Sequence, residues 1–323
     1  MKKLTLIIPF LNEGDEVRKT VESLLSTAGR DIDLILINDA STDGYDYRSV
    51  ARSSHALLIE HPRRKGVAAS RDEAIGRCRT PYFLLLDAHM RSYTPGWADL
   101  LIERVESHRE AIFCCQTFPL DSKGHLAAEK PSGYGAYIDF DDLSVKWNAV
   151  DTDPDDALSA VGCVLGASYA TSTRYWKYLK GLTGLRSYGY DEQLISLKCW
   201  LAGGSCYLIK EIAFGHIFRT LDQIAYPMPK IDFLFNRFYL AALFFDEDYK
   251  QALFNRLRYP DPVVIQLLNR KIEAEKGLIC AQKKYYSRIF QRPLSFVIQM
   301  NERLKSLQPI TLQGPASRSS QSK

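Results

Sequence analysis

The sequence lacks a strong charge bias and lacks any apolar run long enough to cross a membrane. Its 323 residues carry a net charge of +4, which is too small to indicate a nucleic acid as a partner. The most apolar later stretch, Phe233 to Phe245, is short and contains Asn236 and Arg237, which argues against a spanning helix. No signal peptide precedes the first apolar run. We therefore expect a cytoplasmic protein that binds no nucleic acid.

The chain also lacks the cysteine pattern of a disulfide framework. Its seven cysteines are an odd number without regular spacing, and Cys114, Cys115, Cys163 and Cys199 lie in apolar runs. Such thiols are typical of buried side chains in a reducing compartment. The hydrophobic content of 46% and the charged content of 25% are ordinary for a globular protein. A chain of this length can hold one large domain with an appendage.

What the sequence does contain is a regular alternation of strand-like and helix-like segments. Short apolar runs without charge are typical of strands covered on both faces, and amphipathic segments follow them. We expect strands at residues 4–10, 32–37, 56–59, 82–86, 111–115, 161–170 and 205–209, and helices at residues 13–26, 66–78, 97–107 and 191–202. The alternation predicts an α/β fold with a mostly parallel, doubly wound sheet flanked by helices.

Two regions depart from this alternation. Residues 118–160 are rich in Asp, Gly, Tyr and Pro, and we expect a loop-rich excursion or hairpin of the kind that often carries function. From residue 231 onward the pattern is helical, through 244 and again over 262–289. We therefore expect an α/β domain at 1–255, a helical extension at 256–307 and a polar, disordered tail at 308–323.

The first candidate site follows the strand-like run that ends at Leu86. Asp87 and His89 come next, and side chains two residues apart on a strand share one face. Open α/β sheets bind ligands at the carboxyl ends of their strands, and this donor set suits Mn²⁺ better than Ca²⁺. His216 offers a further imidazole, three residues before Arg219. From the residues alone, a capping carboxylate and ordinary histidines remain the alternative.

A second group of residues ends the first strands or opens the following helix, and would line the nucleotide end of the same crevice. It consists of Pro9, Phe10, Asn12, Glu13, Asp39, Arg64, Arg71 and Arg219. Asp39 could accept a hydrogen bond from the imide N–H of uracil, and Arg64 lies beside helix-terminal amides that favour an anion. Arg219 with a metal would neutralise a diphosphate. An Asx turn and a solvated basic turn are the structural alternatives.

A third group contains candidates for acid/base chemistry and for close contact with a ligand. Asp191 and Glu192 begin a helix, where a carboxylate could accept a proton or orient a sugar. Acidic residues also favour a helix N-terminus for dipole reasons alone. Gly166 and Ala167 suggest a close backbone approach to a ligand. Tyr188, next to Gly189, could stack on a sugar ring, whereas Trp200 fits the core better.

Taken in order, these motifs resemble glycosyltransferase family 2 and, more closely, the catalytic domain of polypeptide N-acetylgalactosaminyltransferases. The resemblance runs from residue 4 to about 250 and rests on the ordered coincidence of several short motifs. They are Ile8-Pro9-Phe10-Leu11-Asn12-Glu13, Asn38-Asp39-Ala40-Ser41, Arg64-Lys65-Gly66, Leu86-Asp87-Ala88-His89, Gly166-Ala167, Tyr188-Gly189-Tyr190-Asp191-Glu192, Gly203-Gly204, Gly215-His216-Ile217-Phe218-Arg219, Leu240-Ala241 and Asp246-Glu247-Asp248-Tyr249.

The resemblance implies a GT-A nucleotide-sugar fold and a site for Mn²⁺ at Asp87, His89 and His216. It further implies that Asp39 and Arg64 contact uridine and that Arg219 contacts the diphosphate. The relatives have Trp-Gly-Gly-Glu-Asn where this chain has Tyr188-Gly189-Tyr190-Asp191-Glu192, so the sugar and the stereochemical outcome stay open. No lectin domain or lumenal anchor is evident in the sequence, as expected for a bacterial-type cytoplasmic relative.

We therefore expect a metal-dependent enzyme that moves a hexose or N-acetylhexosamine from a UDP-sugar to an acceptor hydroxyl. A sugar-nucleotide uridylyl or pyrophosphoryl transferase is an alternative, although the turn after the first strand lacks the Gly-rich basic loop expected of one. A non-catalytic binding module with this fold is another.

The sequence leaves the partners of this enzyme open. The acceptor could be a glycan, a lipid-linked glycan or a polypeptide, and the oligomeric state is undetermined. The segment Lys283-Lys284-Tyr285-Tyr286 could touch the inner face of a membrane, but a solvated helix face explains it better.

Overall fold

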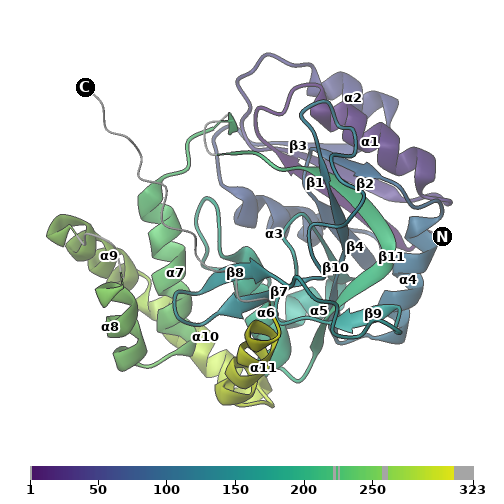
Figure 1. Ribbon diagram of the computed structural model, residues 1–323. Helices are drawn as coiled ribbons and strands as arrows, with labels where there is room; N and C mark the ends of the chain where they lie inside the picture. The colour runs from purple at the N-terminus through teal and green to yellow at the C-terminus, as the bar shows by residue number, and fades with distance from the viewer. Residues whose placement is uncertain (1, 221–222, 225, 257–260, 309–323) are drawn as a thin grey trace, which may run out of the picture.

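The computed structural model describes residues 2–220, 223–224, 226–256 and 261–308. A nine-stranded sheet crosses the molecule in the order β3-β2-β1-β4-β10-β6-β11-β5, with β9 paired to β11 (Figure 1). Its strands are β1 (Leu4–Phe10), β2 (Asp33–Asn38), β3 (Leu57–Glu60), β4 (Tyr82–Leu86), β5 (Met90–Ser92), β6 (Ala111–Leu120), β9 (Leu158–Ala160), β10 (Ser168–Ser172) and β11 (Ser205–Ile217). Strands β1 to β4 pair in parallel, as do β6 and β11, whereas β10, β5 and β9 are antiparallel to their neighbours, so six of the nine strands run in one direction. The expected mostly parallel α/β fold is confirmed.

Helices cover both faces of this sheet because its central strands are apolar on both faces. All seven residues of β1 are buried, and Leu6 and Ile8 belong to one hydrophobic cluster while Ile7 belongs to another. The first cluster includes side chains of α1 (Glu16–Thr27), α2 (Tyr47–Ser53) and α4 (Trp97–Ser107), and the second includes those of α3 (Val67–Arg77), α5 (Thr173–Tyr178), α6 (Asp191–Leu201) and α7 (Lys230–Phe244). The doubly wound arrangement thus follows from side-chain alternation along uninterrupted apolar strands.

The segment 118–160, for which we expected a loop-rich excursion or a hairpin, contains a hairpin. Strands β7 (Ala136–Asp139) and β8 (Ser144–Trp147) pair antiparallel in a small sheet of their own. Strands β6 and β11 are longer than expected, because they stay paired beyond the bulge between Ile209 and Ala213 as far as Leu120 and Ile217. This extension carries His216 to the edge of the sheet where β5 pairs with β11.

The strand expected at 161–170 is wrong for its first part, because β10 begins only at residue 168. Residues 161–167 have scattered backbone partners: the N–H of Val161 donates to Cys206 of β11 at 3.0 Å and that of Cys163 to Ala136 of β7 at 2.9 Å. The N–H of Val164 donates to Ser196 Oγ at 3.0 Å. Gly166 and Ala167 therefore lie in a loop and not in a strand. The carbonyl oxygen of Ala167 accepts from the N–H of Asp87 at 3.1 Å, which brings this loop to the end of β4.

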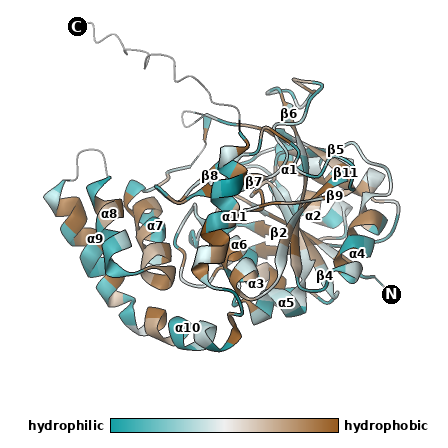
Figure 2. Cartoon of the chain, turned by 60° about the horizontal axis from the view of Figure 1, so that its bottom comes forward, coloured by the Kyte–Doolittle hydropathy of each residue, from teal (hydrophilic) through white to brown (hydrophobic). Residues whose placement is uncertain are grey.

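The C-terminal helices α8 (Glu247–Asn255), α9 (Pro262–Ala274), α10 (Lys276–Ile289) and α11 (Leu294–Ser306) gather on one side of the sheet, with polar and apolar residues interspersed along each (Figures 1 and 2). Leu268 and Tyr286 belong to the same hydrophobic cluster as one face of the sheet. Buried Asn301 of α11 accepts from the N–H of Ile138 in β7 at 2.7 Å. The boundary at residue 255 stays a prediction, and residues 309–323 of the expected tail lie outside the described residues.

Within the described part of the chain, no helix combines the length and the apolar character that a membrane span requires. All seven cysteines are free, and Cys114, Cys115, Cys163 and Cys199 are buried, as their apolar surroundings in the sequence predict.

Gly66 joins the start of α3 to the loop that precedes α6. Its φ is +92°, and an added Cβ would lie 2.6 Å from the Cα and carbonyl oxygen of Ser187. The N–H of Val67 donates to the same carbonyl at 2.9 Å. Two loops that are far apart in sequence are thereby held in backbone contact.

We expect Gly66→Ala to lower the free energy of unfolding by about 1–3 kcal/mol, because the new Cβ clashes with backbone and strains a positive φ. Gly76→Ala is the matched control, since a Cβ there meets nothing within 4 Å and should stabilise α3 by about 0.5–1 kcal/mol. Urea unfolding of both variants measures the difference. Equal stability would contradict this account of Gly66.

Candidate active site

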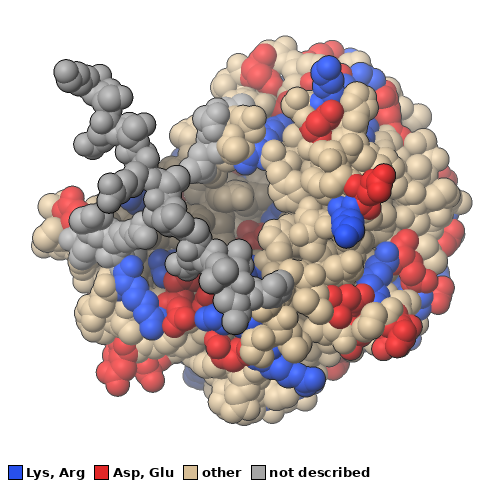
Figure 3. Space-filling view, viewed as in Figure 1, with Lys and Arg blue, Asp and Glu red and all other residues tan. Residues whose placement is uncertain are grey.

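A cavity of about 390 Å³ lies beyond the carboxyl ends of β1, β2 and β4, and the face of the molecule in Figure 3 is hollowed between α7 and the sheet. Most of the residues singled out in the sequence line this cavity. They are Pro9, Phe10, Glu13, Asp39, Arg64, Arg71, Asp87, His89, Gly166, Ala167, Tyr188, Asp191, Glu192, His216 and Arg219. Segments separated by as many as two hundred residues therefore meet in one place.

Two of the candidate residues, Asn12 and Gly189, are not among the lining residues. Asn12 Oδ1 accepts from the N–H of Thr42 at 2.7 Å, so this side chain fastens the turn after β2 to the end of β1. The carbonyl oxygen of Gly189 accepts from Asn236 Nδ2 at 2.9 Å, and an added Cβ would lie 2.6 Å from the ring of Phe233. Both residues shape loops that border the cavity.

Asp87, His89 and His216 form a compact cluster of metal-ligating groups. One donor atom from each side chain lies within 4.8 Å of the others, and His216 Nε2 is 3.5 Å from Asp87 Oδ2. The expectation that Asp87 and His89 share one face of a strand is wrong, because β4 ends at Leu86 and both side chains come from the turn before β5. The two side chains converge through that turn, and His216 joins them because β11 pairs with β5.

The chemistry of this cluster fits a divalent cation. Both ring nitrogens of His216 are buried; Nδ1 has no hydrogen-bond partner among the described residues, and Nε2 has only the long contact of 3.5 Å with Asp87. Such poorly satisfied groups are costly unless something binds them. Burial lowers the pKa of His216 below its ordinary value, which favours the neutral ring that coordinates metals. One carboxylate and two imidazoles suit Mn²⁺ and similar borderline ions.

Glu13 holds this cluster from behind. Its Oε2 lies 3.2 Å from His89 Nδ1, and its two oxygens accept from both Nη atoms of Arg219, at 2.9 and 2.6 Å. Burial alone would raise the pKa of Glu13, but His89 and Arg219 lower it, so the carboxylate is ionised. A carboxylate on Nδ1 leaves Nε2 of the same ring available for a ligand.

Arg71 lies beneath the cluster as a fully enclosed cation. Its Nη2 donates to Asp87 Oδ1 at 3.1 Å and to the carbonyl oxygen of Gly166 at 3.2 Å. Its Nη1 donates to Asp191 Oδ2 and, at 3.2 Å, to the hydroxyl of Tyr169. The guanidinium is thus committed to protein partners, although sequence reasoning had assigned it to the nucleotide.

Asp39 is likewise engaged by the protein. The N–H groups of Lys65 and Gly66 donate to its two carboxylate oxygens, each at 2.8 Å. The anion that faces these amides is therefore the side chain of Asp39 itself. Arg64 lines the same cavity; its Nη1 donates to the carbonyl oxygen of Pro227, and its guanidinium lies 5.1 Å from the centroid of the Tyr226 ring.

The two acidic residues at the start of α6 have different surroundings. Asp191 is buried and paired with Arg71 and Tyr169. Glu192 lies against Gly166, where a Cβ would come within 2.2 Å of its Oε1. Burial, with the nearby charge of Asp191, raises the pKa of Glu192 to about 8. At neutral pH Glu192 is therefore mainly a neutral acid that can donate a hydrogen bond.

Sequence reasoning missed the aromatic rim of the cavity. Trp147, at the end of β8, and Phe218, just after β11, line it with exposed fractions of 36% and 44%, and their ring centroids lie 6.1 Å apart. Phe218 stands between two candidate residues in the sequence and could have been suspected. Trp147 lies in the irregular segment, where no local pattern links it to the site.

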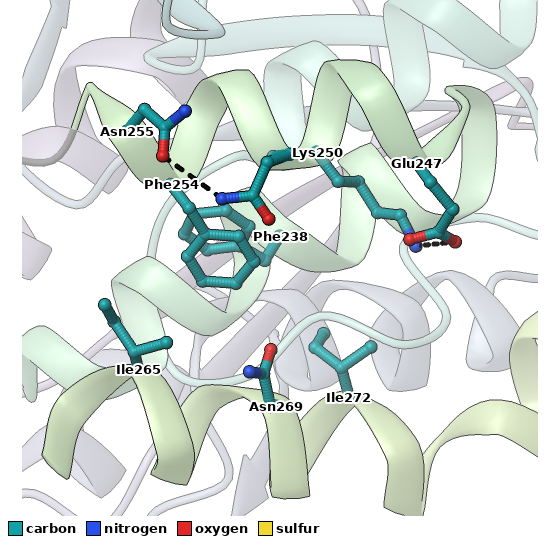
Figure 4. A pocket seen from close by; sticks show the side chains of 9 residues that line it. Phe238, Glu247, Lys250, Phe254, Asn255, Ile265, Asn269 and Ile272 are labelled. Carbon is teal, nitrogen blue, oxygen red and sulfur yellow. Dashed lines mark hydrogen bonds and ion pairs between the residues drawn. The ribbon is translucent and has the colours of Figure 1, made fainter. Parts of the chain in front are cut away.

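A second cavity of about 450 Å³ lies between α7, α8 and α9, as Figure 4 shows. The stacked rings of Phe238 and Phe254 have centroids 4.0 Å apart, and Lys250 pairs with Glu247 nearby. None of the candidate residues lines this cavity. It shares only Glu247 with the sequence motifs and is separate from the cavity that the candidate residues line.

We expect Glu13→Gln to weaken the binding of Mn²⁺ alone by about 10- to 100-fold, because the variant loses the charge that orients His89 and Arg219. Calorimetric titration of the chelator-treated protein measures the affinity. Glu22→Gln, on the exposed face of α1, should bind Mn²⁺ as the wild type does. Unchanged affinity in Glu13→Gln would refute the supporting role of this carboxylate.

Glu192→Gln should make the free energy of unfolding of the metal-free protein depend less on pH. Because the folded state holds the Glu192 proton up to a pKa of about 8 and the unfolded chain releases it near 4.5, wild-type stability should fall as pH rises between these values. The Gln side chain mimics the protonated acid and does not titrate, so the stability of the variant should not fall in this way as pH rises. Urea unfolding at pH 5 and pH 8 tests it, and a pH slope identical to that of the wild type would contradict the shift.

Comparison with known proteins agrees with this geometry. Residues 5–147 match the family model described as glycosyl transferase family 2. Polypeptide N-acetylgalactosaminyltransferase 3 of Mus musculus is 24% identical over 309 residues, covering 87% of this chain and 48% of the relative. Polypeptide N-acetylgalactosaminyltransferase 15 of the same organism is 27% identical over 228 residues, covering 66% and 35%. The chain thus spans about half the length, or less, of these curated relatives.

Solved structures show the same fold. The crystal structure of GalNAc-T7 with UDP, GalNAc and Mn²⁺ superposes with a TM-score of 0.77 at 18% identity, covering 95% of this chain and 58% of the other. Mannosyltransferase PcManGT from Pyrobaculum calidifontis, in complex with GDP-Man and Mn²⁺, gives a TM-score of 0.52 at 15% identity, covering 94% and 85%. The expected resemblance is confirmed: the chain has a GT-A fold, matches the glycosyl transferase family 2 model at residues 5–147, and is similar to polypeptide N-acetylgalactosaminyltransferases.

Proposed function

We propose that this protein is a metal-dependent glycosyltransferase that moves a hexose or N-acetylhexosamine from a UDP-sugar to an acceptor hydroxyl. The observation that carries the proposal is the convergence of Asp87, His89 and His216 in one cavity with the nucleotide-facing residue Asp39. The relatives named as N-acetylgalactosaminyltransferases and the neighbour crystallised with UDP, GalNAc and Mn²⁺ support it.

The nucleoside would occupy the end of the cavity near Asp39 and Arg64. Asp39 accepts three hydrogen bonds from the protein, and a carboxylate offers about four lone-pair positions. The position left on Oδ2 suits a single donor such as the imide N–H of uracil. Pro9 and Phe10, at the end of β1, would form the floor beneath the base.

The diphosphate would lie between the three candidate ligands and Arg219. A divalent cation held there, for which we propose Mn²⁺, would stabilise the negative charge that develops on the leaving diphosphate. Arg219, held by Glu13, would add a fixed positive charge on the same side. Arg71 would act indirectly, because its hydrogen bond orients Asp87 from below.

The transferred sugar would lie over Gly166 and Ala167, against Tyr188 and Glu192. The absence of a side chain at Gly166 lets the Glu192 carboxyl approach the backbone there. As a neutral acid, Glu192 could donate a hydrogen bond to a sugar oxygen, and Asp191 would keep Arg71 in place. We therefore propose that Glu192 positions the donor sugar.

The acceptor would enter over the aromatic rim formed by Trp147 and Phe218. Exposed aromatic side chains bury large apolar area against a partner at little entropic cost, and these two border the cation site. We propose a polypeptide, glycan or lipid-linked glycan as the acceptor. We also keep the cytoplasm, with peripheral contact to the inner face of the membrane, as the proposed location.

The proposal is tested by measuring UDP release from a panel of UDP-sugars with Mn²⁺ or with excess chelator. We expect release only with the metal, and at least about 100-fold less from Asp87→Ala, because metal stabilisation of the leaving group is worth several kcal/mol. Glu192→Gln should lower turnover while leaving UDP affinity nearly unchanged, which calorimetry checks. UDP release that persists in excess chelator or in Asp87→Ala would contradict the proposal.

A further inference from the structure

The candidate site has a buried histidine behind it that the proposed mechanism does not use. His61 follows β3, and its side chain is 2% exposed. Nδ1 of the ring lies 2.8 Å from Asp39 Oδ1, and Nε2 lies 3.1 Å from Glu73 Oε2. His61 does not line the cavity, so it could affect a bound nucleotide only through Asp39.

We infer that His61 is the positioning residue that aims Asp39 at the base of the donor nucleotide and so helps select uracil. This inference rests on the proposed function, in which Asp39 accepts a hydrogen bond from the base. It adds a residue that the sequence motifs did not single out.

The first argument is the geometry around Asp39. Lys65 N–H and His61 share Oδ1, while Gly66 N–H alone binds Oδ2. Three bonds from two sides fix the plane of the carboxylate, and the remaining lone-pair position is on Oδ2. Without the ring, Oδ1 would keep a single backbone partner, and the carboxylate could rotate away from the base.

The second argument is how His61 itself is held. Its backbone N–H donates to the carbonyl oxygen of Asn38 at 2.9 Å, next to Asp39 in the chain. Glu73 of α3 holds the far side of the ring and also accepts from Lys65 Nζ at 2.7 Å. Each ring nitrogen thus lies at hydrogen-bond distance from a carboxylate oxygen. The ring is therefore fixed between β2, β3 and α3.

Base selection follows from the number of acceptors that Asp39 presents. Uracil offers one imide N–H on this edge, whereas guanine offers an N–H with an adjacent amino group and would use two acceptors. A carboxylate fixed by His61 presents one position. A carboxylate free to rotate would recognise uracil less well and would discriminate less between the two bases.

The test compares His61→Gln and His61→Leu with the wild type by UDP-sugar kinetics and by calorimetric binding of UDP and of GDP. Loss of a buried hydrogen bond to a charged group predicts that KM and the Kd for UDP rise by about 10- to 100-fold in His61→Leu. The value of kcat should stay close to that of the wild type. His61→Gln, which keeps one donor, should lie between, and the preference for UDP over GDP should fall in the same order.

The matched control is His125→Gln, because His125 is exposed and lies beside Asp121 on the surface. It should keep wild-type KM and UDP affinity. Melting temperatures of all variants separate a positioning role from simple unfolding. Wild-type UDP affinity in folded His61 variants, or a loss of kcat without a change in KM, would overturn this inference. Absence of UDP binding by the wild type would instead overturn the proposed function itself.

Discussion

The buried guanidinium of Arg71 is the contact on which the candidate site depends. It binds Asp87 after β4, Asp191 at the start of α6 and the carbonyl oxygen of Gly166. Three segments of the chain meet at this one cation, in surroundings where an unpaired charge costs several kcal/mol. Removal of Arg71 would leave the carboxylates of Asp87 and Asp191 without their shared cation, which is strongly destabilising in a buried site. The site is therefore built into the core of the fold.

From Arg71 outward, charges of opposite sign follow one another across the cavity. Asp87 is supported from below by Arg71, and His89 is supported from behind by Glu13, which also holds Arg219. Each of these groups lines the cavity and has a hydrogen-bond partner in the protein. Groups fixed in this way lose little entropy when a ligand binds. The arrangement suits a dication near the carboxylate of Asp87 and an anionic diphosphate near the guanidinium of Arg219.

Whether the sequence could predict a site residue depended on whether that residue lies next to a recognisable local pattern. Asp87 comes directly after an uninterrupted apolar run, so its position at the ligand-binding edge follows from local pattern alone. His61 stands alone between Glu60 and Pro62, and nothing local indicates that both ring nitrogens face carboxylates. Residues 161–167 read as a strand because they are apolar, yet their backbone partners are spread over β11, β7, a side chain of α6 and the end of β4. Such contacts leave no periodicity in the sequence.

The sequence by itself determined the alternation of strands and helices, the two-faced burial of the sheet and the motifs at its carboxyl edge. These features depend on residues that are neighbours along the chain, where side-chain spacing fixes which face is apolar. Only the tertiary structure decided that His216 joins Asp87, that Arg71 serves the carboxylates and that Trp147 borders the cavity. Those outcomes depend on which strands pair and how loops cross, because distant groups interact only after the chain has closed the intervening loops.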